Sequence, residues 1–156
     1  MFHSTTQAAA ESIRADGFSI AHAGDQGGAE FGAAVYLFPD MDAVEAWESD
    51  MRWFGINEVL LEVDFIGNLY DLDSADIAPA LFAWADRNGL TLNGEPTEAG
   101  RAELVAAAET NPSYHTANGW IVRMLAEQGF DGLFCTNEGA RRQVVVWNVS
   151  TLCVKE

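Results

Sequence analysis

The chain has 156 residues, and its 24 acidic against 8 basic residues give a formal net charge of -16 at pH 7. A chain of this length forms one domain with a substantial core, taken as residues 1–156. The negative field repels phosphate backbones, which argues against a nucleic-acid partner. No apolar run approaches the roughly 20 residues of a membrane span and no secretion signal is seen, so we expect a cytoplasmic protein without a membrane partner. We also expect a monomer.

Residues suited to binding metals or anions are few and scattered. Cys135 and Cys153 lie in expected strands without metal-ligand spacing, so we expect two reduced thiols and no metal site. The adjacent basic residues Arg141 and Arg142 either meet an anionic ligand or lie on the surface. The acidic surplus is typical both of salt-adapted proteins and of proteins that bind basic partners.

The N-terminal region predicts a strand, a helix and a second strand. A short apolar strand opens the chain, and Thr5 or Thr6 can cap a helix over residues 7–16. Gly17 is suited to end that helix, because glycine tolerates the left-handed backbone found after many helices. Residues 18–21 then predict another strand.

A glycine-rich stretch precedes the most aromatic part of the chain. Residues 24–32 contain four glycines and no basic residue, which indicates a loop rather than a phosphate-binding P-loop. Residues 34–38 predict a buried strand, and a Pro-Asp pair then signals the start of a helix. Tyr36 on the strand and Trp47 on the helix either close on a flat ligand or fill the core.

The middle of the chain predicts a hairpin and a helix. Residues 58–65 form the clearest strand, and residues 69–72 are expected to pair with it across a Gly-Asn turn. Asp76 can cap a helix that ends at Gly89. Residues 89–97 contain two glycines and a proline, and we expect a polar loop there.

The last part of the chain predicts two helices and three strands. The helices cover residues 98–109 and 116–128, and the strands cover residues 133–135, 143–147 and 152–155. Strands and helices do not alternate regularly, as they would in a doubly wound parallel sheet. We therefore expect an α+β fold.

Several motifs occur in the order found in a known family. Residues 3–5 read His-Ser-Thr, Tyr36 lies on a later strand, Trp47 follows eleven residues on, and Gln143 begins a late strand after the sequence GFDGL at 129–133. In this order the chain resembles the small ADP-ribosyltransferases of the diphtheria-toxin and poly(ADP-ribose) polymerase branch. The resemblance implies an ADP-ribosyltransferase-like fold, with two packed antiparallel or mixed sheets and flanking helices.

The same resemblance implies that NAD is the substrate and indicates which residues contact it. His3 is expected to bond a ribose hydroxyl, and the Ser4 backbone is expected to contact the nicotinamide amide, with Thr5 beside it. Tyr36 and Trp47 are expected to hold the nicotinamide ring. His3 and Tyr36 also belong to the implied catalytic set.

Gln143 completes the implied catalytic set and stands where the family has Glu. Its amide can accept a hydrogen bond from the ribose 2′-hydroxyl, but it carries no charge with which to stabilise an oxocarbenium-like transition state. Glu138 either replaces the missing carboxylate or is a solvated loop residue. Arg141 is expected to meet the NAD diphosphate. Chain-forming polymerase activity is not expected.

Three functions follow from these patterns. The first is a mono-ADP-ribosyltransferase that modifies a protein side chain and releases nicotinamide, as an effector or a phage-encoded modifier. The second is a degenerate relative that binds NAD, ADP-ribose or only a protein, without turnover. The third is an unrelated acidic interaction protein.

Overall fold

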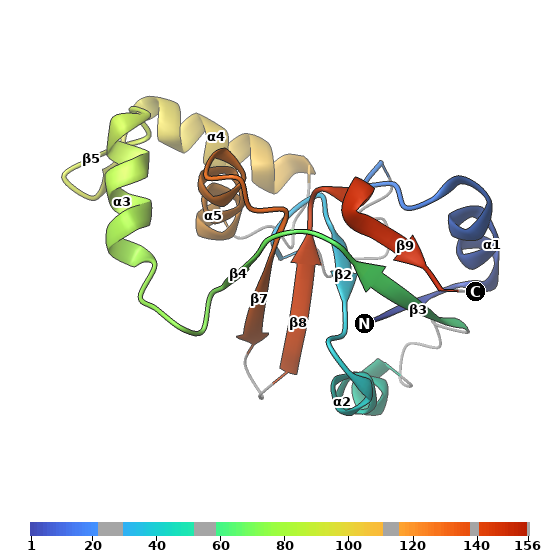
Figure 1. The fold of residues 1–156 in the computed structure, drawn as a ribbon. Coiled ribbons are helices and arrows are strands. Elements are labelled where there is room, and N and C mark those ends of the chain that lie inside the picture. The colour runs from blue at the N-terminus through green and yellow to red at the C-terminus, as the bar shows by residue number, and fades with distance from the viewer. Residues whose placement is uncertain (22–29, 52–58, 111–115, 138–140, 156) are drawn as a thin grey trace.

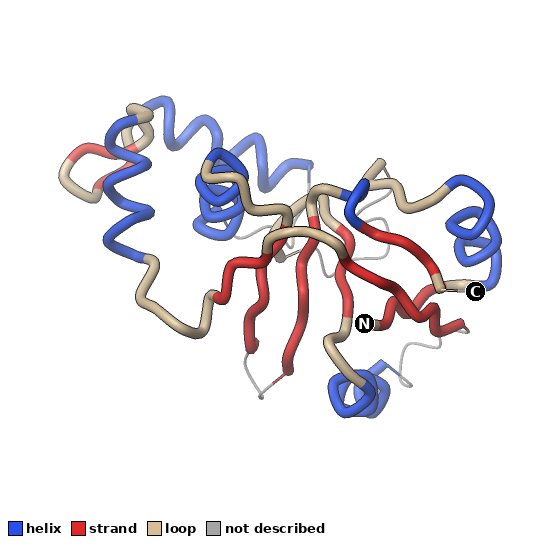
Figure 2. The backbone as a smooth tube through the Cα atoms, in the orientation of Figure 1, coloured by secondary structure: helices blue, strands red, loops and turns tan. Residues whose placement is uncertain are grey.

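The computed structural model describes residues 1–21, 30–51, 59–110, 116–137 and 141–155 (Figure 1). Strands occupy the centre of the described structure and helices lie around them (Figure 2). Helices and strands follow one another irregularly, so the α+β class predicted from the sequence is confirmed. None of the described helices is long and apolar enough to cross a membrane.

Two sheets form the centre of the described structure. The first is antiparallel and consists, in spatial order, of β1 (Phe2–Thr5), β3 (Val59–Phe65) and β9 (Leu152–Val154). The second consists, in spatial order, of β2 (Val35–Leu37), β8 (Arg141–Val146), β7 (Gly132–Asn137) and β4 (Leu69–Asp71). In the second sheet β4 is parallel to β7, whereas the other neighbours are antiparallel.

The two sheets are joined where β1 passes the end of β2. The Phe2 N–H donates to the Phe38 carbonyl oxygen at 2.9 Å, and the Phe38 N–H donates to the Phe2 carbonyl oxygen at 2.8 Å. Nearby, the ring Nδ1 of His3 bonds the Tyr36 carbonyl oxygen at 3.0 Å. β1 otherwise pairs with β3 along all its residues, so it belongs to the first sheet.

The second sheet is covered on both faces. One face packs against α3 (Ala78–Arg87) and α5 (Thr116–Glu127), and the other packs against the first sheet and α1 (Gln7–Asp16) (Figure 1). Residues 144–146 of β8 are each at most 1% exposed. A continuous apolar run is the pattern expected of a strand buried on both faces.

Local capping sets several helix ends, as the sequence predicts. Thr6 caps α1, because its Oγ1 accepts a backbone N–H three residues later at 3.3 Å, and Gly17 ends this helix with φ 83°. Asp40 caps α2 (Met41–Met51) in the same way at 3.0 Å. α4 (Glu98–Thr110) lies beside α5, away from the sheets.

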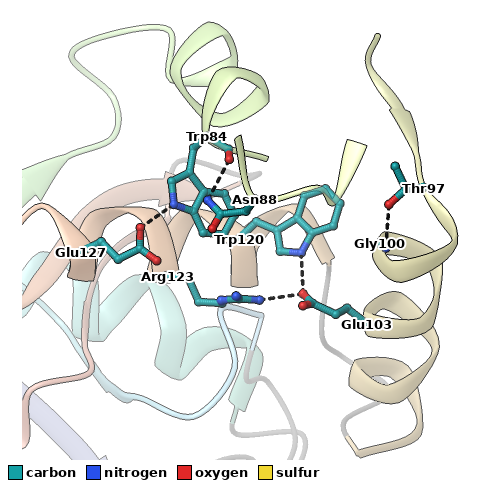
Figure 3. Close-up of polar contacts among 8 residues, drawn as sticks. All are labelled: Trp84, Asn88, Thr97, Gly100, Glu103, Trp120, Arg123 and Glu127. Atoms are coloured by element: carbon teal, nitrogen blue, oxygen red, sulfur yellow. Dashed lines mark hydrogen bonds and ion pairs between the residues drawn. The ribbon is translucent and has the colours of Figure 1, made fainter. Parts of the chain in front are cut away.

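Arg123 of α5 links three helices (Figure 3). Its guanidinium lies over the Trp84 ring of α3, 5.4 Å from the centroid, and its Nη1 donates to Glu103 Oε2 of α4 at 2.6 Å. Trp84 Nε1 donates to Glu127 Oε2 at 2.7 Å, and Trp120 Nε1 donates to Glu103 Oε2 at 3.4 Å. Both indole nitrogens therefore have acceptors at the edge of an apolar cluster.

The predicted hairpin between residues 58–65 and 69–72 is wrong. The second segment is β4, which pairs in parallel with β7 of the other sheet. The Asn68 N–H donates to Asp131 Oδ2 at 2.8 Å, and the Asp131 N–H donates to the Asn68 carbonyl oxygen at 2.9 Å. These two bonds direct the chain from one sheet to the other.

Together with a bond from the Asn148 side chain, the Asn68 bond lowers the pKa of the Asp131 carboxyl.

The strand predicted for residues 18–21 is also wrong, because this segment is irregular and ends in a turn. The Ser19 hydroxyl accepts the Ala21 N–H at 3.2 Å, a local bond that competes with pairing to a strand. The Phe18 ring packs against the apolar cluster between the two sheets and meets the His3 ring edge to face. The apolar Phe18 side chain therefore contributes to the core and does not mark a strand.

The segment predicted as a polar loop, residues 89–97, contains a small hairpin. Its strands are β5 (Thr91–Leu92) and β6 (Glu95–Pro96), which pair antiparallel. Asn93 and Gly94 between them have φ 55° and 82°. An Asn-Gly pair with positive φ angles is the common two-residue hairpin turn, so the signal was present in the sequence.

We expect Gly100→Ala to lower the free energy of unfolding. A Cβ at Gly100 of α4 would lie 2.0 Å from the Leu90 carbonyl oxygen, far inside contact distance. Alanine is favoured over glycine inside a helix by about 1 kcal/mol. Forcing a methyl group into packed structure costs about 1–3 kcal/mol. At this separation we expect the steric clash to outweigh the gain in helix propensity. Urea denaturation measures the net change in the free energy of unfolding.

Ala102→Gly, at an exposed position of the same helix, is the control and should cost about 1 kcal/mol through helix propensity alone. A Gly100→Ala protein more stable than the wild type would contradict the close packing of α4 against Leu90.

Candidate functional site

A connected row of polar side chains crosses the helix-covered face of the second sheet. Gln143 of β8 is 5% exposed. Its Nε2 donates at 3.6 Å to the Sγ of Cys135, which is its cross-strand neighbour on β7. The Cys135 thiol donates to Asn137 Oδ1 at 3.6 Å, and Asn137 Nδ2 donates to Glu30 Oε2 at 3.1 Å. We call Gln143, Cys135, Asn137 and Glu30 the polar row. Each hydrogen bond in the polar row is donated in the direction of the Glu30 carboxylate.

The thiol in the polar row is neutral at physiological pH. The pKa of Cys135 is raised to about 11, mainly by burial and also by the charges of Asp73 and Glu30, while the hydrogen bond from Gln143 acts to lower it. A protonated thiol is a weak donor and not a nucleophile. Cys135 therefore relays hydrogen bonds along the row and is not suited to covalent catalysis.

Two elements hold Glu30 in place. Asn118 of α5 donates its Nδ2 to the Glu30 carbonyl oxygen at 3.2 Å. The Tyr36 hydroxyl accepts the Phe31 N–H at 2.8 Å and donates to the Gly32 carbonyl oxygen at 3.1 Å. The hydroxyl of Tyr36 thus fixes the backbone that carries Glu30, a role that the sequence did not suggest.

An aromatic and cationic group lies beside the polar row, because Arg141 of β8 is the cross-strand partner of Asn137 on β7. Arg141 precedes Gln143 by two strand positions, so its side chain leaves β8 on the same face. Its guanidinium lies over the Trp47 ring, 5.5 Å from the centroid. Trp47 meets the Phe38 ring edge to face, with centroids 5.9 Å apart. Among the described residues, Trp47 Nε1 is the buried side-chain polar atom that has no hydrogen-bond partner.

The neighbouring arginine points the other way. Arg142 Nη2 donates to Asp40 Oδ1 at 2.8 Å, and the two side chains are 40% and 43% exposed. The same Asp40 oxygen caps α2. Arg142 therefore contributes to the position of α2, whereas Arg141 accompanies Gln143 and Trp47.

His3 lies apart from the polar row. Its Nδ1 is bonded to the Tyr36 carbonyl oxygen, so this nitrogen carries the proton of the neutral ring. Burial lowers the pKa of His3, and the bond to Tyr36 offsets part of this effect. The ring meets Phe18 edge to face at 5.4 Å on the side of the second sheet opposite Gln143. Ser4 and Thr5 continue β1 beside β3.

The structure thus groups some of the residues singled out in the sequence and separates others. Arg141 and Gln143 leave β8 on one face, the Arg141 guanidinium lies over Trp47 of α2, and Tyr36 projects from the face that α3 and α5 cover. His3, Ser4 and Thr5 belong to the other sheet. Glu138 and residues 24–29 of the glycine-rich stretch lie outside the described residues.

Sequence reasoning missed Glu30, Asn137 and Cys135. The predicted strand ends at Cys135, whereas the observed β7 continues to Asn137, and alternation along it places both side chains on one face. Glu30 had no local signal in the sequence, because its contact with Asn137 spans 107 residues of chain. Within the described parts of the chain, no group of three or more His, Cys, Asp or Glu residues is arranged to hold a metal ion.

No known protein family, curated protein or solved structure matches this chain. The chemistry of the site is therefore inferred from its residues and their contacts. They comprise a carboxylate, two amides, a guanidinium and an indole whose N–H has no partner among the described residues. These groups suit a ligand that has a flat ring, hydroxyl groups and an anionic part.

We expect iodoacetamide at pH 8 to alkylate Cys153 and to spare Cys135. Cys153 is exposed, whereas Cys135 is 3% exposed. With a pKa near 11, roughly one Cys135 thiol in a thousand is ionised at this pH. Mass spectrometry of tryptic peptides measures both positions.

The Cys153→Ser variant should remain unlabelled when native and become labelled in urea. Equal labelling of both thiols in the native protein would show that the polar row is open to the reagent, contrary to the burial described above.

Proposed function

We propose that the protein is a mono-ADP-ribosyltransferase that transfers ADP-ribose from NAD to a protein side chain. Its two sheets with flanking helices support an ADP-ribosyltransferase-like fold. The main support is the group formed by Arg141, Gln143 and Trp47 on one face of the sheet. A guanidinium suits the diphosphate, an amide suits a ribose hydroxyl and an indole suits a flat ring. NAD carries all three.

In the proposed reaction the bond between ribose C1′ and the nicotinamide nitrogen breaks, and its electron pair leaves with neutral nicotinamide. A nucleophilic side chain of the acceptor protein forms the new bond to C1′ and releases its proton. Gln143 orients the ribose by a hydrogen bond, and Arg141 neutralises the diphosphate. Holding both parts of NAD in one geometry lowers the entropic part of the barrier.

The proposal also covers the location of the reaction, the oligomeric state and the acceptor protein. We place the reaction in the cytoplasm and take the chain to act as a monomer. The net charge of -16 favours an acceptor protein with a basic surface, because opposite charges accelerate encounter.

A second candidate is an NAD- or ADP-ribose-binding protein without turnover. The separation of His3 from Gln143 on opposite sides of the sheet favours it, as does the bond that already engages Gln143 Nε2. Binding in this candidate uses the same arginine and indole. The two functions differ only in whether nicotinamide is released.

We expect Arg141→Gln to weaken NAD binding and Arg142→Gln to leave it unchanged. The two residues are adjacent, but only Arg141 lies beside Trp47, whereas Arg142 is bonded to Asp40. A charge-assisted contact contributes about 1.5–3 kcal/mol, which corresponds to an affinity loss of roughly 10- to 100-fold. Isothermal calorimetry with NAD measures the difference.

Incubation with labelled NAD and cell lysate then separates transfer from binding alone. Equal NAD affinity of both arginine variants and the wild type would rule out this site. Measurable NAD binding without nicotinamide release would favour the second candidate over the transferase.

A further inference from the structure

Glu30 ends the polar row with one oxygen bonded and the other available. Its Oε2 accepts from Asn137 at 3.1 Å. Its Oε1 accepts no hydrogen bond from the residues that the structure describes. A half-buried carboxylate with an unused oxygen is suited to accept a hydrogen bond from a ligand hydroxyl.

The position of Glu30 is held from three sides. Asn118 bonds its carbonyl oxygen, Asn137 bonds its carboxylate, and the Tyr36 hydroxyl bonds the N–H of the next residue. The three contacts come from α5, β7 and β2. A charge held in this way needs little reorganisation during a reaction, which is the condition for effective electrostatic stabilisation.

Asp73 is the other carboxylate whose charge reaches Cys135, but its oxygens are occupied. Oδ1 accepts the Thr136 N–H at 3.0 Å, and Oδ2 accepts the Thr136 hydroxyl at 2.6 Å. Thr136 alternates with Cys135 along β7, so these bonds form away from the polar row. Asp73 therefore offers a matched comparison: a nearby carboxylate that is bonded at both oxygens.

We propose that Glu30 supplies the negative charge that Gln143 lacks, and that its second oxygen bonds a ribose hydroxyl of NAD. The proposal rests on the proposed function. As the C1′–nicotinamide bond breaks, positive charge develops on the ribose ring and the ionised Glu30 stabilises it. Glu30 forms no covalent bond to the sugar and transfers no proton. The electron pair leaves with nicotinamide, and the acceptor side chain provides the nucleophile.

The test compares the wild type with Glu30→Gln, Glu30→Asp and Asp73→Asn, using NAD itself as the probe. Glu30→Gln keeps an oxygen for Asn137 and removes the charge. We expect its kcat for nicotinamide release to fall about 100-fold or more, the size of effect seen when one preorganised electrostatic contact is lost. NAD affinity should stay within about threefold, because the contact acts mainly in the transition state.

Glu30→Asp should recover part of the lost rate, because it retains the charge on a shorter side chain. Asp73→Asn should match the wild type in both kcat and NAD affinity. Circular dichroism melting of each variant checks that the fold is retained. A large loss of rate in Glu30→Gln, a smaller loss in Glu30→Asp and none in Asp73→Asn would support a charge effect over a packing effect.

Two results would overturn the inference, and they are distinguishable. A Glu30→Gln protein with the wild-type kcat would remove Glu30 from the reaction while leaving the transferase function standing. A wild type that binds no NAD, or binds it without releasing nicotinamide, would remove the transferase function and the role of Glu30 with it.

Discussion

Strand β8 is buried on both faces, and the alternation of its side chains governs the arrangement of the site. Gln143 and Val145 lie on the face covered by α3 and α5, whereas Val144 and Val146 face the first sheet. At the start of the strand, Arg141 contacts Trp47 of α2 and Arg142 bonds Asp40, which caps α2. A shift of one residue in register would exchange the two arginines and place Gln143 in the opposite core. The pairing of β8 with both β2 and β7 prevents that shift.

The polar row is a continuous hydrogen-bonded path through an otherwise apolar surface. An unpaired buried polar group costs about 1–3 kcal/mol, so the links between Gln143, Cys135 and Asn137 limit the cost of placing them there. Their sulfur contacts at 3.6 Å are weak ones. A ligand that offered Gln143 a stronger partner could therefore replace the thiol at small cost, which is consistent with a binding role for this amide.

His3 and Tyr36 make hydrogen bonds within the protein that limit the contacts they can offer to a ligand. His3 holds β1 against β2 through a ring nitrogen, and burial keeps its ring neutral. The Tyr36 hydroxyl is used twice by the backbone next to Glu30. The His3–Tyr36 bond adjoins the Phe2–Phe38 junction of the two sheets.

Much of the local structure was determined by the sequence alone. Thr6, Asp40 and Gly17 mark helix ends because capping depends on side chains within a few residues. The valines of β8 indicated a strand because burial on both faces leaves a continuous apolar run. Only the tertiary structure decided that β4 pairs with β7 and that Glu30 meets Asn137, since these contacts join residues more than 60 positions apart. Sequence periodicity reports which face of an element is buried, but it carries no information about which distant segment buries it.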